Sequence, residues 1–161
     1  MNNTYLLLGS NMGNSLNQLS VAIDHIKKKT GEIIRKSGLY STAAWGNPNQ
    51  PDFLNQVIKI ETTLTVEETL ESILAIEKLM GRVRTTKNAP RIIDIDILFF
   101  DKEIISEKDL VVPHPEIQNR RFVLIPLNEI SPQFKHPVLK KTIAELLEEC
   151  PDNLEVKRIT D

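Results

Sequence analysis

The chain has 161 residues, of which 40% are hydrophobic and 26% charged, a balance typical of one globular domain with a buried core over residues 1–161. Lysines and arginines number 20 against 22 aspartates and glutamates, and a net charge of −2 excludes a generally basic surface for nucleic acid. The apolar runs are too short to cross a bilayer, and the single Cys150 has no partner for a disulfide or a zinc site. We therefore expect a cytoplasmic, monomeric protein.

The first predicted elements are a strand over residues 4–8 and a helix that ends at Gly31. Between them, Gly9, Ser10 and Asn11 are expected to break the strand, and such a loop can place backbone N–H groups near a ligand. Asn14 or Ser15 is expected to cap the helix. Its predicted buried stripe consists of apolar residues at helical spacing, namely Leu16, Leu19, Ile23 and Ile26.

Two further strands are predicted over residues 32–41 and 53–62, separated by a loop rich in glycine, proline and asparagine. That loop holds the only tryptophan, Trp45, which either plugs the edge of the core or stacks on a ligand. In the second strand Phe53, Asn55 and Val57 share one face. A buried amide needs hydrogen-bond partners, which a flat heteroaromatic ligand or backbone groups could supply to Asn55.

The next predicted helix begins after Thr65, which forms a capping-box pattern with Glu68, and ends near Gly81. Its expected buried stripe is formed by Leu70, Ile73 and Leu74. Glu77 falls in the middle of this stripe, where a carboxylate should be paired or hydrogen-bonded. Either an ion pair with nearby arginines or a place in a ligand site would satisfy it.

Residues 82–91 form a polar segment with four cations, Arg82, Arg84, Lys87 and Arg91. Such a segment is either a solvated surface or a lid that clamps polyphosphate through charge-assisted hydrogen bonds. It leads directly into a strongly apolar strand with a pair of aspartates suited to a metal ion, and this pair favours the lid.

That apolar strand carries Asp94 and Asp96, which are two residues apart and therefore point to one face, with Cα atoms about 6.5–7 Å apart. Two ionised carboxylates in an apolar setting are unfavourable unless a cation lies between them. Mg²⁺ takes oxygen ligands and commonly binds one or two carboxylates together with substrate phosphates. The alternative is that both aspartates face solvent or pair with arginines.

The remaining chain supplies His114 in a rigid Pro-His-Pro context, Arg120, an apolar segment over residues 122–127, and a last helix capped by Thr142. His136 is expected at the surface, and residues 154–159 are a candidate edge strand. Helices and hairpin-like strands mix without strict β-α-β alternation. This predicts an α+β fold with a mainly antiparallel sheet covered by helices.

Five segments in this order resemble the 6-hydroxymethyl-7,8-dihydropterin pyrophosphokinase (2-amino-4-hydroxy-6-hydroxymethyldihydropteridine diphosphokinase) family of folate biosynthesis. They are Gly9-Ser-Asn, Gln50-Pro-Asp-Phe-Leu-Asn, Gly81-Arg-Val-Arg, Pro90-Arg-Ile-Ile-Asp-Ile-Asp-Ile-Leu, and Val112-Pro-His-Pro with Asn119-Arg-Arg-Phe. The resemblance implies a ferredoxin-like core. It also implies transfer of the β,γ-pyrophosphoryl group of ATP to the hydroxymethyl oxygen of the pterin, with release of AMP.

The same resemblance implies roles for particular residues. Asp94 and Asp96 would hold two Mg²⁺ ions and act in catalysis together with Arg82 and Arg91. The pterin would contact Thr42, Ala43, Trp45, Phe53, Asn55 and Phe122, and the nucleotide would contact Glu77, Arg84, Ile97, His114 and Arg120. Leu74, Asp109 and Pro115 depart from well-known members at positions near the nucleotide. Asp96 and a metal-bound hydroxide are both candidates for the general base.

Two other functions are compatible with parts of the sequence. A nucleotidyltransferase also uses a Gly-Ser and a pair of aspartates, but there the aspartates follow within one short helix, whereas here more than half the chain intervenes. A ferredoxin-like binding or regulatory module would leave Asp94 and Asp96 as ordinary polar residues. Products formed from ATP distinguish all three.

Overall fold

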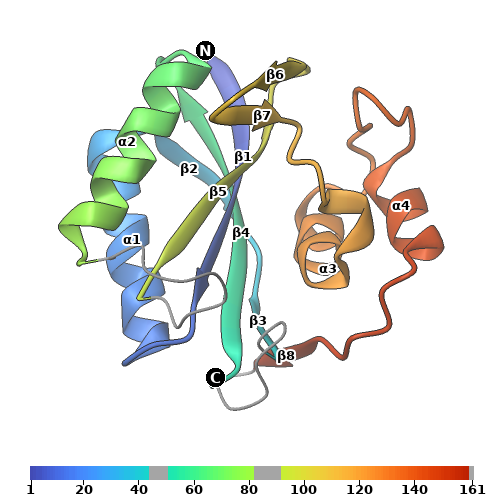
Figure 1. The fold of residues 1–161 in the computed structure, drawn as a ribbon, viewed down its shortest axis with the longest axis horizontal. Helices are drawn as coiled ribbons and strands as arrows, with labels where there is room; N and C mark the ends of the chain where they lie inside the picture. The colour runs from blue at the N-terminus through green and yellow to red at the C-terminus, as the bar shows by residue number, and fades with distance from the viewer. Residues whose placement is uncertain (44–50, 82–91, 160–161) are drawn as a thin grey trace.

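The structure is a computed structural model that describes residues 1–43, 51–81 and 92–159. In these ranges a sheet separates two layers of helices (Figure 1). The strands are β1 (Asn2–Ser10), β2 (Glu32–Lys36), β3 (Leu39–Thr42), β4 (Phe53–Thr62), β5 (Asp94–Phe100), β6 (Ile105–Glu107), β7 (Leu110–Val112) and β8 (Lys157–Ile159). The helices are α1 (Ser15–Lys29), α2 (Val66–Leu79), the 3₁₀ turn η1 (Ile117–Asn119), α3 (Arg121–Ile130) and α4 (Ile143–Glu149).

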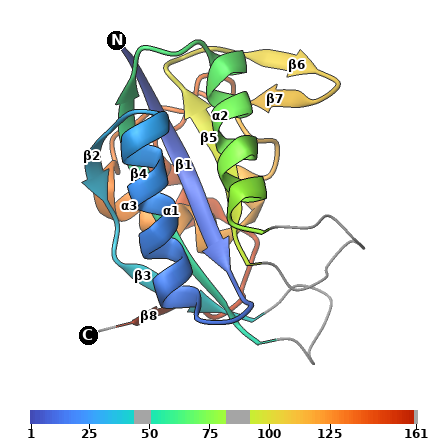
Figure 2. The same cartoon turned by 90° about the vertical axis from the view of Figure 1, so that its left-hand side faces the viewer.

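The main sheet has the strand order β5-β1-β4-β3-β8, and β2 also pairs with β4. Its pairings are antiparallel. Helix α1 connects β1 to β2, and α2 connects β4 to β5, on the same side of the sheet (Figures 1 and 2). This is the ferredoxin-like α+β arrangement that the sequence predicts, so that prediction is confirmed. The hairpin of β6 and β7 forms a separate two-stranded sheet.

Each face of the sheet has its own apolar core because side chains alternate along a strand. The face toward α1 and α2 buries Leu6, Leu8, Ile58, Ile60, Ile95 and Ile97. The face toward α3 and α4 buries Tyr5, Leu7, Val57, Leu98, Val123, Leu124 and Leu127. Both faces are covered, and the sheet is therefore held rigid from both sides.

The helix caps follow the sequence pattern. Asn14 caps α1 by accepting a hydrogen bond from the Asn17 backbone N–H at 3.1 Å. Complete capping boxes begin α2, at Thr65, and α4, at Thr142. None of the helices in the described ranges is both long and apolar enough to cross a membrane.

Two strand predictions are wrong in their bounds. β1 continues through Gly9 and Ser10, since these residues pair with β4 instead of forming a loop. Residues 32–41 are two strands, because Ser37 interrupts the ladder by accepting the Val57 N–H on its hydroxyl at 3.0 Å.

Three side chains differ in burial from the sequence-based expectation. Leu16 is 54% exposed and Leu74 is 40% exposed, while Ala22 and Ile76 are fully buried on the same helices. His136 is only 4% exposed, so its predicted surface position is wrong. Its Nδ1 accepts the Val138 and Leu139 N–H groups, each at 3.1 Å, which holds the ring inside the turn that follows it.

Candidate active site

The two aspartates of β5 project toward the α3 side of the sheet. They alternate with Ile95 and Ile97, which lie in the core on the α1 and α2 side and are 4% and 6% exposed. Asp94 and Asp96 are half-buried. The predicted shared face is therefore confirmed, and the two carboxylates lie at the start of an edge strand.

Strand β1 connects the aspartates to a second set of polar residues. Gly9 pairs with Asp94 on β5 and with Asn55 on β4. Directly paired residues of antiparallel strands project to the same face. Asn55, Gly9 and Asp94 therefore form one row across three strands.

The Asn55 end of this row is tightly packed. Asn55 is 3% exposed, and its Nδ2 donates to the Thr42 hydroxyl at 3.0 Å. A Cβ atom added to Gly9 would lie 3.0 Å from Asn55 Oδ1 and 3.7 Å from Phe53 Cδ1, so only glycine leaves room for the amide as it stands. Ala43 follows at an exposed position. Four predicted pterin residues therefore lie close together on β3, just after it, and on β4. They are Thr42, Ala43, Phe53 and Asn55.

His114 lies on the aspartate side of the site. Its backbone N–H donates to the Leu98 carbonyl at 3.0 Å, which ties it to β5. Its Nδ1 accepts the Glu116 N–H at 3.1 Å, and the neutral ring therefore carries its proton on Nε2. Burial, followed by the positive charge of Arg120, lowers the pKa of His114 below its ordinary value, against smaller opposing effects of Glu116 and Asp94. The ring is thus a neutral donor near Asp94 and Arg120.

Two more predicted site residues lie at the start of α3. Arg120 is its N-cap residue, and its guanidinium carbon lies 5.9 Å from the centroid of the Phe122 ring. Phe122 is half-buried against the core of the α3 face. An aromatic ring and a cation therefore lie on the same side of the sheet as the aspartates.

Glu77 and Ile97 lie differently from the other predicted nucleotide residues. Glu77 is 3% exposed, and its Oε2 accepts the Ile95 N–H at 2.7 Å. The expectation that its carboxylate is hydrogen-bonded is confirmed. The Ile97 side chain is in the opposite core, so a nucleotide contact from Ile97 would use its backbone.

Four predicted site residues, Trp45, Arg82, Arg84 and Arg91, lie outside the described residues, as does Lys87. Within the described ranges, no group of three or more histidines, cysteines or acidic residues could hold a metal by itself. Two carboxylates on one face fit a hard cation that completes its shell with water and phosphate oxygens, which is the usual coordination of Mg²⁺.

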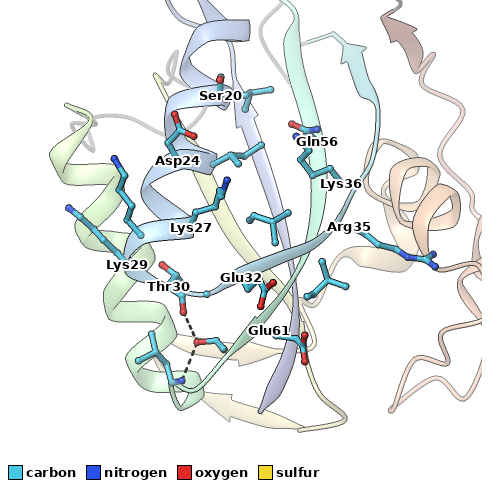
Figure 3. Close-up of a pocket in the computed structure, with 18 of the residues that line it drawn as sticks. Ser20, Asp24, Lys27, Lys29, Thr30, Glu32, Arg35, Lys36, Gln56 and Glu61 are labelled. Carbon is cyan, nitrogen blue, oxygen red and sulfur yellow. Dashed lines mark hydrogen bonds between the residues drawn. The ribbon is translucent and has the colours of Figure 1, made fainter.

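A cleft of about 1020 Å³ lies elsewhere, between α1 and β2 (Figure 3). Its floor includes Leu19 and Ile33, and its charged side chains have both signs, such as Lys27 and Glu32. None of the predicted site residues that the structure describes lines it. This cleft is therefore separate from the site on β1, β4 and β5.

The structural role of Gly9 differs from the sequence-based prediction. Gly9 is expected in a loop that faces a ligand, but it lies inside β1, next to the side-chain amide of Asn55. The strand pairing that brings these residues together has no local sequence signal.

Known proteins resemble this chain over most of its length. The family model of the 7,8-dihydro-6-hydroxymethylpterin-pyrophosphokinases (HPPK) matches residues 5–132. The chain is 42% identical over 145 residues to the 2-amino-4-hydroxy-6-hydroxymethyldihydropteridine pyrophosphokinase of Aquifex aeolicus, and the match covers 90% of each. It is 41% identical to the protein of that name from Methylorubrum extorquens, covering 82% of this chain and 84% of the relative.

Some relatives are much longer. The folic acid synthesis protein fol1 of Pneumocystis carinii is 38% identical over 92% of this chain, which spans only 20% of that protein. A crystal structure of Plasmodium falciparum HPPK-DHPS superposes with a TM-score of 0.77 at 23% identity, covering 92% of this chain and 43% of that chain. At this identity the superposition shows the shared fold.

Proposed function

The chain belongs to the 7,8-dihydro-6-hydroxymethylpterin-pyrophosphokinase family, which uses ATP, and we propose that it transfers the β,γ-pyrophosphoryl group of ATP to 6-hydroxymethyl-7,8-dihydropterin. In this reaction the hydroxymethyl oxygen forms a bond to Pβ and loses its proton. The bond from Pβ to the oxygen that bridges the α- and β-phosphates breaks, and AMP leaves with that oxygen. The products are AMP and the pterin pyrophosphate used in folate biosynthesis.

The observation that carries this proposal is the row of Asn55, Gly9 and Asp94 across three neighbouring strands. Neighbouring strands lie about 4.8 Å apart, so the strands of Asn55 and Asp94 are about 10 Å apart. A bicyclic pterin that is read by Asn55 at one end can therefore present its hydroxymethyl oxygen toward Asp94. Positioning of this kind is the main contribution that a protein makes to phosphoryl transfer.

At the pterin end, we assign ring stacking to Phe53 and Phe122 and recognition of the polar edge to Asn55 and Thr42, together with Ala43 and Trp45. The support is the packing of Asn55 against Gly9 and its bond to Thr42. Because Thr42 accepts from one amide hydrogen of Asn55, the orientation of the amide is fixed before the substrate arrives.

At the nucleotide end, Asp94 and Asp96 would hold two Mg²⁺ ions, which supply charge neutralisation of the triphosphate. His114 would donate a hydrogen bond from neutral Nε2 to a phosphate oxygen, and Arg120 and Arg84 would add positive charge. We assign Arg82 and Arg91 to the charge that develops as AMP leaves. Ile97 would contact the nucleotide through its backbone groups. Glu77, on α2, would contribute to the nucleotide end of the site.

We further propose that the chain acts as a monomer with a single domain. A cytoplasmic location fits the use of ATP as donor.

The experiment that tests the reaction is product analysis. The protein is incubated with ATP, MgCl₂ and 6-hydroxymethyl-7,8-dihydropterin, and AMP, ADP and pyrophosphate are quantified against the pterin consumed. One AMP per pterin is expected. Release of pyrophosphate would instead indicate a nucleotidyltransferase, and unchanged ATP would indicate a binding module. A reaction without pterin controls for simple ATP hydrolysis.

Asp96→Ala tests the role of the carboxylate pair. Loss of one cation ligand should remove several kcal/mol of transition-state stabilisation and lower kcat by at least about 100-fold. The melting temperature should remain close to wild type or rise slightly, because repulsion between two carboxylates is relieved. Asp24→Ala, at an exposed position of α1, is the matched control. A large drop in melting temperature would instead identify Asp96 as part of a structural ion pair.

A further inference from the structure

Glu77 contacts the strand that carries both aspartates from the opposite side of the sheet. Its Oε2 accepts the N–H of Ile95, the residue between Asp94 and Asp96, at 2.7 Å. We propose that Glu77 is a positioning residue, which fixes the backbone between the two aspartates and thereby the spacing of their carboxylates. The inference rests on the proposed function in one respect, that Asp94 and Asp96 together form the cation seat.

The position of β5 in the sheet explains why such a contact is needed. β5 is the terminal strand of the sheet order and pairs on one side with β1. Along an edge strand, every second residue projects its N–H and C=O away from the neighbouring strand. The N–H of Ile95 is such an outward group, and the carboxylate of Glu77 takes the place of a missing strand.

The Ile95 N–H is placed so that a hydrogen bond to it can control the direction of both aspartate side chains. It belongs to the peptide that joins Asp94 to Ile95, so its direction depends on the ψ angle of Asp94 and the φ angle of Ile95. Rotation of this peptide would turn the side chain of Asp94 relative to that of Asp96. A hydrogen bond that holds the peptide therefore holds both carboxylates.

The surroundings of Glu77 make the contact rigid. The residue is 3% exposed on α2, on the same helix face as Ile73 at 1% and Ile76 at 0%. A carboxylate buried among such neighbours has few alternative rotamers. Its hydrogen bond to the Ile95 N–H, at 2.7 Å, has the length of a well-formed bond. Supporting contacts of this kind orient the ligands of metal sites.

Three variants separate positioning from other roles. Glu77→Gln keeps an acceptor of the same reach and removes the charge. Glu77→Ala removes the acceptor, and Glu77→Met removes it while it preserves most of the side-chain volume. Thr69→Val is the matched control, because Thr69 is equally buried on α2 and loses one hydrogen bond, from its hydroxyl to the Thr65 carbonyl at 2.8 Å.

The primary readout is amide hydrogen exchange at Ile95, measured by NMR on the protein without ligands. We expect Glu77→Ala and Glu77→Met to raise the exchange rate of Ile95 by at least about tenfold more than that of Asp96, whose backbone faces β1. Glu77→Gln and Thr69→Val should leave the ratio of the two rates near its wild-type value. Glu77→Met supplies the result if the alanine variant does not fold.

The second readout is binding of Mn²⁺ in the presence of a non-hydrolysable ATP analogue, together with steady-state kinetics. We expect Glu77→Met to weaken Mn²⁺ binding and lower kcat by about 10–100-fold, with little change in the KM for the pterin. Glu77→Gln should recover most of both losses. Thr69→Val should change stability without this pattern.

Three results would overturn the inference: unchanged exchange at Ile95 in Glu77→Met, equal losses in Glu77→Gln and Glu77→Met, or the same losses in Thr69→Val. Failure of the proposed function has a different signature, since wild-type protein would then form no AMP. The exchange measurement uses protein without substrates and is independent of that outcome.

Discussion

Gly9 is the residue on which the geometry of the proposed pterin site depends most directly. Gly9→Ala places a Cβ atom 3.0 Å from Asn55 Oδ1, so the amide must shift. Loss of one well-placed hydrogen bond is worth about 1 kcal/mol, so we expect the KM for the pterin to rise by about fivefold to tenfold. The KM for ATP should change by less than about twofold, because the aspartates remain in place.

Steady-state kinetics with each substrate varied in turn provide the measurement. Ser10→Ala is the control, since Ser10 is the next residue of β1 and projects to the other face. An equal rise in both KM values for Gly9→Ala would show that the strand as a whole had moved.

At the scale of residues, the sequence predicts whatever depends on local geometry. The shared face of Asp94 and Asp96 follows from the period of a strand, and it is confirmed. The hydrogen bond of Asn55 to Thr42 and the proton position of His114 depend on residues that other elements bring close. Those features were visible only in the structure.

At the scale of elements, a capping box at the N-terminus stabilises α2, the helix that carries Glu77. The Thr65 hydroxyl accepts the Glu68 N–H at 3.1 Å, and the Glu68 carboxylate accepts the Thr65 N–H at 2.9 Å. Thr65→Ala removes the first of these bonds, and we expect the free energy of unfolding to fall by about 1 kcal/mol in urea titrations.

Glu67→Ala is the matched control for this cap. Glu67 lies in the same first turn but takes no part in the capping box, so its substitution should remove only a small interaction with the helix dipole. If Thr65→Ala and Glu67→Ala lower the free energy of unfolding equally, the capping hydrogen bond of Thr65 contributes no more than a single negative charge in the first turn.

The elements differ in how well their sequences identify them. Asn14, Thr65 and Thr142 mark helix starts through side-chain bonds within three residues, which a sequence pattern contains. The break between β2 and β3 depends on the distant Val57 N–H, which bonds to the Ser37 hydroxyl. Leu16 and Leu74 were assigned to buried stripes because helical spacing alone does not specify which turns meet the sheet.

At the scale of the whole molecule, we expect stability to decrease on mild acidification. Burial lowers the pKa of His114, with a further contribution from Arg120, and burial lowers that of His136, with a further contribution from Lys102. The unfolded chain therefore binds more protons than the folded one below about pH 6.5, so stability rises with pH in that window. The stability that the two neutral histidines contribute is fully present above about pH 6.5. It is lost as the pH falls toward their lower pKa values in the folded protein.

Thermal melts between pH 5 and pH 7.5 give the measurement. His136→Asn is the informative variant, because its Oδ1 can replace Nδ1 as the acceptor of the Val138 and Leu139 N–H groups but does not titrate. Its melting temperature should depend less steeply on pH than that of wild type. An unchanged slope would show that His136 does not contribute to the acid sensitivity.

The overall architecture is the part that the sequence predicted best. The sequence predicts two helices, each of which connects two strands, and strands that are neighbours in hairpins. Few arrangements of these elements cover both apolar faces of a sheet. The separate cleft between α1 and β2 had no counterpart in the sequence, since it depends on how far an exposed helix stands from an edge strand.

Because β1 is hydrogen-bonded to β4 on one side and to β5 on the other, the proposed pterin site and the proposed cation site share one backbone frame. Thermal motion cannot separate these two proposed sites without breaking the backbone hydrogen bonds that join β1 to its neighbours. In the proposed reaction, the distance between the pterin and the triphosphate would therefore be set when the chain folds, before either substrate binds.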